Sequence, residues 1–387
     1  MRHGPAIGIR VNDFVTRRVG AVLRRRGWRE KPVPFIGYGT PDGVRVLGRL
    51  VLRPDDEKLL PAHAGAWLRR RGWRNFLELP APHRPVRLTV AGRTRTLRTD
   101  RRGYVDTTVG SGLEPGWHTV RLAAADGTEA EVPVQIVGPD ERFGMISDID
   151  DTIISTWMPR LFLAVWNSFF QLEGNRQAVP GMARMYQRLL AEHPGAPIFY
   201  VSTGAWTSIH FLKRFMARHG FPRGALLLTD WGPTPTAWVR SGTDHKRNAM
   251  AELAGEFPGI RWVLVGDDGQ HDPELYREFA QKHPDRVRAV VLRSLSPTEQ
   301  VLAHGTATLL AGSRRAWLPR GVPSLHGADG DALWPALADA LGLRAERPPK
   351  TRGRSGRQAM RRPGSLAESR TDTACWEGSP TTAGGPA

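Results

Sequence analysis

Three aspartates stand within four positions in the segment 148–151, which reads DIDD and is followed by Thr152. The apolar run FGMIS comes directly before them, so we expect the carboxylates at the end of a buried strand. Carboxylates this close together repel one another, which raises their pKa values unless a cation or hydrogen bonds compensate. A divalent cation is the natural partner of such a set. An Asp-rich turn can also cap the following helix, and this segment alone does not separate the two interpretations.

A second acidic segment favours the chemical interpretation. Residues 266–272 read GDDGQHD and follow another apolar run, RWVLV. Ser202 and Thr203 close the run PIFYV, and Lys246 lies in the segment DHKRNAM, ahead of the RWVLV run. A hydroxyl donates a hydrogen bond to a phosphoryl oxygen, an ammonium neutralises its charge, and a metal bridges carboxylate and phosphoryl oxygens. The spacing therefore predicts a phosphate site at adjacent strand ends.

The elements that must position these residues alternate between strand and helix after Pro139. Five short apolar runs predict strands: FGMISDI, APIFYVST, ALLLTD, RWVLVGDD and VRAVVLRS. The segments between several of them, such as TSIHFLKRFMARHG, have helical periodicity. This alternation predicts an α/β domain over 140–343 with a parallel sheet, in which ligands bind beyond the C-terminal strand ends.

The chain before Pro139 has a different texture. Alternating apolar segments separated by glycine turns predict a small antiparallel β-sandwich over 33–139, with no cluster of residues that suggests chemistry. Residues 1–32 have apolar positions at near-helical spacing with arginines between them, which predicts a basic amphipathic helix. We expect its apolar stripe to pack on its own domain, and binding to an anionic bilayer is the alternative. Residues 344–387 have the composition of a disordered basic tail.

Composition excludes several classes of protein. The 387 residues carry 55 basic and 38 acidic side chains, a formal net charge of +17 that favours anionic partners. Arginine accounts for 49 of the basic residues, a skew that genome composition alone can produce. A single cysteine, Cys375, excludes an internal disulfide and a cysteine zinc site. No apolar run is long enough for a membrane span or a secretory signal, so we expect a cytoplasmic protein.

The order of these motifs resembles the haloacid dehalogenase superfamily of aspartate-nucleophile phosphohydrolases. More narrowly, SDIDDTI, YVSTGAW, DHK and LVGDDGQHDPELY are similar to the catalytic domain of the actin-patch-associated phosphatidate phosphatases, relatives of the lipins. The similarity spans about Glu141 to Ser294 with all four motifs in order. It implies a Rossmann-like parallel sheet and hydrolysis of a phosphomonoester.

The resemblance also implies roles for individual residues. Asp148 would be the nucleophile that forms an aspartyl-phosphate, and Asp150 the general acid and then the general base. Mg²⁺ would be held by Asp148, the backbone carbonyl of Asp150, and Asp267. Ser202 would bind a phosphoryl oxygen, and Lys246 would stabilise the nucleophile and the developing charge.

The supporting positions are less fixed. Thr152 would support the turn, Thr203 is the substitute for Ser202, and Asp268 and Asp272 are the two candidates for supporting the metal. The family often has Ser-Pro where this chain has Thr203-Gly204, and a serine where it has Asp268, which leaves the orientation of the substrate open. A register that begins at Asp150 is also conceivable, but only Asp148 as first residue gives the order Asp, Asp, Thr. His245 and His271 flank the motifs. A role in contacting a headgroup or in proton transfer is the alternative to simple exposure, which is more common for histidines on polar loops.

Substrate and partners follow from the same resemblance. We expect a Mg²⁺-dependent phosphatase acting on phosphatidate or a related lipid phosphate, with peripheral contact to the inner face of an anionic membrane left open and nucleic acid as an unfavoured partner. The apolar insert 157–171 follows the nucleophile and is either core or a lip for acyl chains. No large cap domain fits between the first two motifs, so the site should be open. The alternatives are a phosphatase for soluble or polynucleotide phosphates and a non-catalytic phosphatidate-binding module. The oligomeric state is not readable from these motifs.

Overall fold

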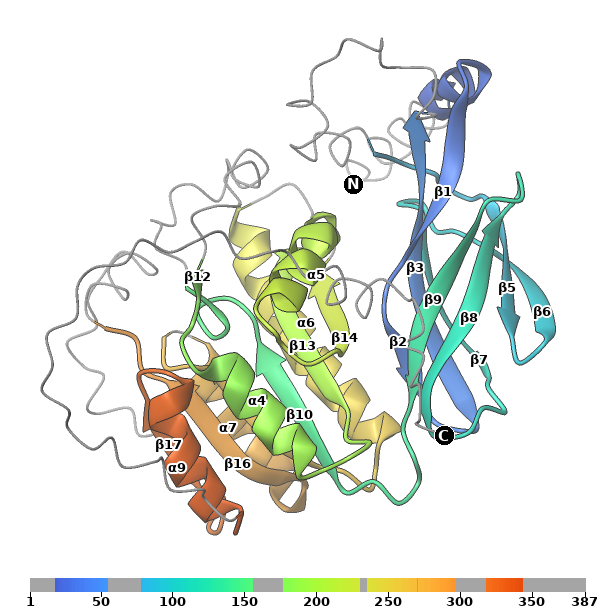
Figure 1. Cartoon of the computed structure of the whole chain (residues 1–387). Coiled ribbons are helices and arrows are strands. Elements are labelled where there is room, and N and C mark those ends of the chain that lie inside the picture. Colours follow the sequence, from blue (N-terminus) through green and yellow to red (C-terminus); the bar gives the residue numbers. More distant parts are fainter. Residues whose placement is uncertain are drawn as a thin grey trace, which may run out of the picture.

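The computed structural model describes residues 18–54, 78–155, 177–229, 235–269, 271–296 and 318–343, with only the backbone of Thr207 and of 235–241 (Figure 1). The expected apolar insert 157–171 and basic tail 344–387 lie outside the described residues, as do residues 1–17 of the expected helix region 1–32.

A six-stranded parallel sheet forms the centre of the second domain. Its strand order is β14-β13-β10-β15-β16-β17, and every neighbouring pair is parallel. The strands are β10 (Phe143–Asp148), β13 (Ile198–Ala205), β14 (Ala225–Thr229), β15 (Arg261–Asp267), β16 (Val287–Arg293) and β17 (Ser324–Gly327). The chain runs from β10 outward to β14 and then returns to the other side of β10, so the switch point lies beside β10.

The expected parallel α/β architecture is confirmed, with one additional strand. The five predicted apolar runs are all strands of this sheet. β17 was not predicted, because SLHG is short, half-exposed and lacks an apolar run. A two-stranded antiparallel pair, β11 (Ile154–Ser155) and β12 (Gln177–Ala178), lies outside the main sheet.

Helices cover the sheet because their apolar positions recur at helical spacing. The helices are α4 (Met182–Ala191), α5 (Ile209–Arg218), α6 (Pro235–Glu256), α7 (Asp272–Lys282) and α9 (Gly330–Ala340), with short 3₁₀ turns η4 (Trp206–Ser208) and η5 (Pro284–Arg286). In α4, Met182, Met185, Tyr186 and Leu189 form one buried stripe. α4 packs beside α9 and α6 beside α7, and Figure 1 shows α4 and α9 in front of the sheet.

The first domain is one curved, mainly antiparallel sheet of nine strands. They are β1 (Trp28–Pro34), β2 (Gly37–Gly39), β3 (Gly43–Pro54), β4 (Leu79–Pro80), β5 (Pro85–Val90), β6 (Arg93–Arg98), β7 (Tyr104–Gly110), β8 (Gly116–Ala124) and β9 (Glu129–Ile136). The long strand β3 pairs with β1, β2, β4 and β7. From β2 the sheet continues through β9, β8 and β5 to β6. The antiparallel strand pairing is as predicted, except that β2 and β9 pair in parallel. The expected division into two sheets of a sandwich is not confirmed.

The two domains share a hydrophobic core. Phe35 and Tyr38 of the first domain belong to the same buried cluster as the strands of the second. Phe35 stacks on Trp206 with ring centroids 4.3 Å apart, and Tyr38 meets Phe199 edge-on at 4.9 Å. Lys213 Nζ also donates to the carbonyl of Pro34 over 2.8 Å. Because Trp206 follows the Ser202 segment directly, the first domain supports one side of the predicted site.

Charged groups close the edge of this domain interface. Arg45 on β3 donates to both carboxylate oxygens of Asp106, each over 2.8 Å, and to Glu252 of α6 over 2.9 Å. Glu256 lies one turn further along α6. Burial raises the pKa of Glu256 to about 7. The attraction of Arg45 lowers this pKa, and repulsion from Glu252 and Asp106 raises it further.

We predict that Glu256→Gln stabilises the protein at pH 8 but not at pH 5. The pKa of Glu256 is raised in the fold from 4.5 to about 7, so its carboxyl stays neutral at low pH and stability falls as the pH rises through that range. The full shift corresponds to about 3 kcal/mol, and partial exposure reduces the expected gain at pH 8 to about 1–2 kcal/mol. Urea unfolding at the two pH values measures it. Glu129→Gln, at an exposed position on β9, is the control, and equal gains for both variants would contradict the prediction.

The N-terminal helix is present but less covered than expected. Residues 18–25 are helical, with Gly20 buried and close to the side chain of Leu52. Val19 and Val22 are 42% and 46% exposed, so the favoured packing of the apolar stripe on its own domain is not seen at these two valines.

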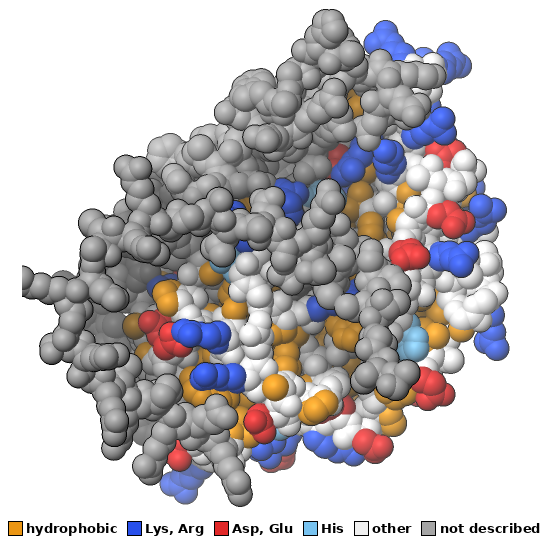
Figure 2. Space-filling view, viewed as in Figure 1, with side chains coloured by type: hydrophobic (Ala, Val, Ile, Leu, Met, Phe, Trp, Pro, Cys, Tyr) orange, Lys and Arg blue, Asp and Glu red, His pale blue; other side chains and the backbone are white. Residues whose placement is uncertain are grey.

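Over the first domain, the face shown in Figure 2 carries basic side chains interspersed with acidic ones. The net charge of +17 is therefore not gathered into one patch on the part of this face that is described.

Among the described helices, none has both the length and the apolar character needed to cross a bilayer.

Candidate active site

The predicted residues converge at the C-terminal edge of the parallel sheet. Asp148 ends β10 and Asp267 ends β15, and these strands are paired directly. Ser202 lies near the end of β13, on the other side of β10, where the pairing with β14 becomes irregular. Lys246 comes from α6 and Asp272 from the first turn of α7. Residues that are far apart in sequence therefore surround the end of β10.

Asp148 is held by two side chains. It is 3% exposed, its Oδ1 lies 2.7 Å from Lys246 Nζ, and its Oδ2 accepts a hydrogen bond from Thr152 Oγ1 over 3.2 Å. Burial raises the pKa of Asp148, and repulsion from Asp272 raises it further, whereas the attraction of Lys246 lowers it. Lys246 stays protonated, because the attraction of Asp148 and Asp272 outweighs burial and raises the pKa of its ammonium.

The chain after Asp148 turns sharply, which aims Asp150 at the next strand. The N–H groups of Ile153 and Ile154 both donate to the carbonyl of Ile149, and Asp151 has a left-handed φ of 59°. This turn brings Asp150 beside β13, where Ser202 Oγ donates to Asp150 Oδ2 over 2.8 Å. The N–H of Gly204 donates in turn to Ser202 Oγ over 2.9 Å. The Asp150 carboxylate is thus oriented before any substrate binds.

Three carboxylates form an acidic cluster beside Lys246. One oxygen from each of Asp148, Asp267 and Asp272 lies within 4.8 Å of the others. Asp272 Oδ1 lies 2.6 Å from Lys246 Nζ, whereas its buried Oδ2 has no hydrogen-bond partner among the described residues. Burial and repulsion from Asp272 raise the pKa of Asp267 to about 8, although Lys246 and the Gly269 N–H oppose this. One ammonium cannot neutralise three carboxylates, so the site has the charge and the oxygen donors that fit a divalent cation.

Comparison with known proteins bears on the same segment. Residues 143–294 match the family described as phosphatidate phosphatase APP1, catalytic domain. The match covers less than half of the chain, and over this segment the chain is similar to that catalytic domain. It holds Asp148, Ser202, Lys246 and the three aspartates of the second acidic segment, Asp267, Asp268 and Asp272.

Two curated relatives match the same part of the chain. Phosphatidate phosphatase APP1 of Saccharomyces cerevisiae is 29% identical over 175 residues, which is 44% of this chain and 29% of the relative. An uncharacterised protein of Schizosaccharomyces pombe is 24% identical over 169 residues, 43% of this chain and 27% of the relative. The chain thus spans less than a third of the length of either relative.

Among solved structures, the HAD domain of the effector protein Lem4 from Legionella pneumophila aligns with 44% of this chain and 98% of its own. The sequence identity is 14% and the TM-score 0.29, which is too low to support a fold assignment. The fold assignment therefore rests on the strand order and pairing of the sheet itself.

Contacts in the structure distinguish the two aspartates that the sequence left undecided. Asp268 Oδ1 accepts a hydrogen bond from the N–H of Leu295 over 2.9 Å, which ties it to the chain after β16. Asp272 instead enters the acidic cluster and contacts Lys246. Gly266 lies against Asp272, since a Cβ at this glycine would come within 2.5 Å of Asp272 Oδ2. Asp272, and not Asp268, therefore belongs to the acidic cluster.

The remaining predicted residues have supporting contacts. The carbonyl of Thr203 accepts from Thr229 Oγ1 over 2.8 Å, which fixes the Ser202–Gly204 segment to β14. His245 Nε2 lies 3.2 Å from the carbonyl of Leu227, also on β14, and His271 immediately precedes α7. Among the described residues, the group of metal-ligating atoms that lie close together comprises three aspartates and neither histidine.

The sequence analysis missed one buried residue of the second domain. Arg293 ends β16 and is only 6% exposed. The signal was an arginine that closes the apolar run VRAVVL at a strand end, at the same edge of the sheet as the acidic segments.

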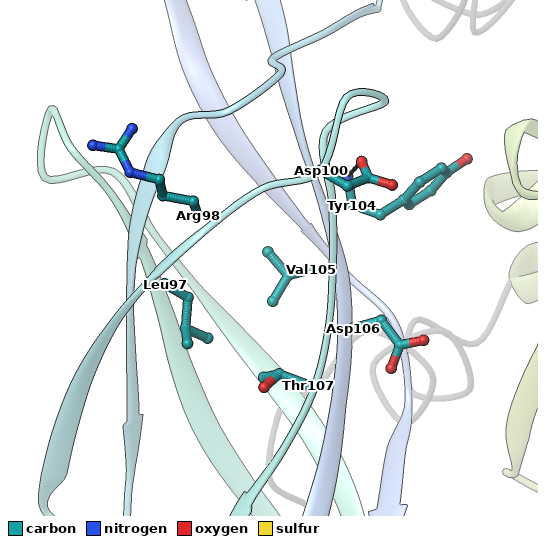
Figure 3. A pocket seen from close by; sticks show the side chains of 7 residues that line it. All are labelled: Leu97, Arg98, Asp100, Tyr104, Val105, Asp106 and Thr107. Carbon is teal, nitrogen blue, oxygen red and sulfur yellow. Dashed lines mark hydrogen bonds between the residues drawn. The ribbon is translucent and has the colours of Figure 1, made fainter.

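A hollow of about 260 Å³ lies on the first domain (Figure 3), and no residue of the acidic cluster lines it. It is lined by Leu97, Arg98, Asp100, Tyr104, Val105, Asp106 and Thr107. Asp100 accepts from the N–H groups of Arg102 and Tyr104, and Asp106 is paired with Arg45. Because both carboxylates are already engaged within the protein, the hollow offers no comparable site.

Proposed function

We propose that this chain is a Mg²⁺-dependent phosphatidate phosphatase that releases phosphate through an aspartyl-phosphate on Asp148. The observation that carries the proposal is the cluster of Asp148, Asp267, Asp272 and Lys246 within a segment of the APP1 catalytic-domain family. The resemblance to the APP1 relative of yeast supports the lipid substrate.

In this proposal Asp148 attacks the phosphorus, and its position beside Lys246 keeps the attacking oxygen close to a positive charge. Asp150 gives its proton to the leaving oxygen and then accepts one from the water that hydrolyses the aspartyl-phosphate. Ser202, which orients Asp150, would also donate to a phosphoryl oxygen. This assignment uses the register that begins at Asp148, since Asp148 is the aspartate of the DIDD segment that meets Lys246.

Asp148, Asp267 and Asp272 are the side chains that would hold the cation, and the carbonyl of Asp150 remains a proposed ligand. Mg²⁺ would neutralise the carboxylates and draw charge from the phosphoryl oxygens. Thr152 and Thr203 have supporting roles. Thr152 donates a hydrogen bond to the carboxylate of Asp148, and the carbonyl of Thr203 accepts one from Thr229.

A cytoplasmic location and peripheral contact with an anionic membrane belong to the same proposal. A phosphatidate headgroup is presented at a membrane surface, so an enzyme without a large cap domain over its site would suit such a substrate.

The test is phosphate release from phosphatidate in detergent micelles and from an aryl phosphate, each with Mg²⁺ and with excess chelator. We expect chelation to lower both rates at least about 10²-fold. Release from the aryl phosphate alone would keep the phosphatase and overturn the lipid substrate. Tight binding of phosphatidate with no release from either compound would instead indicate a binding module.

A further inference from the structure

The side chain of Arg293 connects two backbone segments that are far apart in the sequence. Its Nη1 donates to the carbonyl of Asp151 over 2.7 Å, and its Nε donates to the carbonyl of Ala328 over 3.1 Å. A buried guanidinium needs such acceptors, because leaving its N–H groups unpaired costs several times more than an ordinary hydrogen bond gains. The planar fork of arginine suits two acceptors held at fixed positions.

The first acceptor belongs to the strained part of the site. Asp151 has φ 59°, a conformation that costs a non-glycine residue about 1 kcal/mol or more and persists only where its surroundings hold it. Asp151 lies between Asp150, which meets Ser202, and Thr152, which meets Asp148. Rotation of the Asp151 peptide would therefore move both contacts.

The second acidic segment is tied to the same residues. The N–H of Asp268 donates to the carbonyl of Arg293 over 2.9 Å, and the N–H of Leu295 donates to Asp268 Oδ1 over the same distance. Asp267 is the register partner of Arg293 in the β15–β16 pair. The side chain of Arg293 thus holds the segment after Asp148, while its main chain holds the segment after Asp267.

We propose that Arg293 is a positioning residue that sets the distance between the Asp148–Thr152 turn and the Asp267–Asp272 segment. It reaches the site through the Asp151 carbonyl, next to the residues that contact Ser202 and Asp148. The inference rests on the proposed function, because it assigns Arg293, at the end of β16, the task of positioning the residues that the function uses. It assigns no chemical step to Arg293.

The test compares Arg293→Met and Arg293→Lys with Arg286→Met. Arg286 is a matched control because it also donates to backbone carbonyls, those of Ile260, Ala254 and Phe257, but stands just before β16, at the opposite end of that strand. Mn²⁺ binding to the substrate-free protein, measured by calorimetry, and kcat and KM for an aryl phosphate are followed together with the melting temperature.

We expect Arg293→Met to weaken Mn²⁺ binding and to lower kcat by about 10- to 100-fold each, with KM nearly unchanged. Arg293→Lys keeps the charge but cannot donate to both carbonyls in the same geometry, so it should fall between Arg293→Met and the unsubstituted protein. Arg286→Met should lower the melting temperature while metal affinity and kcat stay within about threefold of those of the unsubstituted protein.

The inference is overturned if folded Arg293→Lys and Arg293→Met keep both metal affinity and kcat, or if Arg286→Met loses as much of each. If Arg293→Met does not fold, the lysine variant alone decides between these outcomes. If the unsubstituted protein releases no phosphate from any compound, the proposed function fails, and the Mn²⁺ affinities still decide whether Arg293 positions the two segments.

Discussion

Asp148→Asn should reduce phosphate release by at least about 10⁴-fold while leaving the fold intact. The amide has nearly the shape of the carboxyl and can still contact Thr152 and Lys246, so the surrounding hydrogen bonds survive. It lacks the nucleophilic oxygen, and it removes one charge from the acidic cluster. We would measure phosphate release from an aryl phosphate at saturating Mg²⁺, with circular dichroism to follow the fold.

Asp140→Asn is the matched control for this prediction. Asp140 is exposed and lies just before β10, at the opposite end of the strand from Asp148, so the same change of charge should leave the rate within about twofold. Residual release by Asp148→Asn above about a hundredth of the unsubstituted rate would rule out Asp148 as the nucleophile. A second test on the unsubstituted protein is trapping of a phosphorylated intermediate, which the asparagine variant should not form.

Lys246→Met should lower kcat by about 10³-fold and destabilise the protein as well. The ammonium contacts Asp148 and Asp272 at 2.7 and 2.6 Å, and all three groups are largely buried. Removing the cation leaves two carboxylates without their partner, which costs about 3 kcal/mol when one half of a buried pair is lost. The free energy of unfolding at pH 8 in the absence of divalent cations measures this cost.

Lys282→Met provides the control, because Lys282 is exposed at the end of α7 and its loss changes the net charge by the same amount. We expect it to leave kcat unchanged and to alter the free energy of unfolding by no more than about 0.5 kcal/mol. If Lys246→Met kept kcat within tenfold of the unsubstituted protein, Lys246 would have only a structural role. If added Mg²⁺ stabilised Lys246→Met more than the unsubstituted protein, the cation would be taking over part of the charge balance.

Local patterns were sufficient to predict the parallel sheet. Runs such as RWVLV are buried on both faces, and this produces a continuous apolar signal in sequence. β17 escaped because a short edge strand that is half-exposed has no such signal. The joining of the first domain into one sheet through β3 also escaped, because it depends on which distant strands pair and not on the alternation within any of them.

The candidate site shows the same division. Asp148, Asp267 and Lys246 could be chosen from sequence because each stands at or near the end of an apolar run or in a recognisable motif. Asp268 and Asp272 could not be separated, since the direction of each side chain depends on Leu295 and on the start of α7. Arg293 was missed because its role comes from a backbone carbonyl of a distant turn, and a carbonyl has no signature in sequence.

The position of β10 between β13 and β15 affects how a newly made chain reaches this structure. β10 is the first strand of the parallel sheet to leave the ribosome. α4, β13, α5, β14 and α6 all follow before β15 can pair with the second edge of β10. Until then the strand that ends in Asp148 has an open edge and an apolar surface, which favours pairing with the wrong partner. Nascent chains that stop before residue 261 would carry Asp148 without Asp267 or Asp272, so the proposed metal binding would stabilise only chains that extend past Asp272.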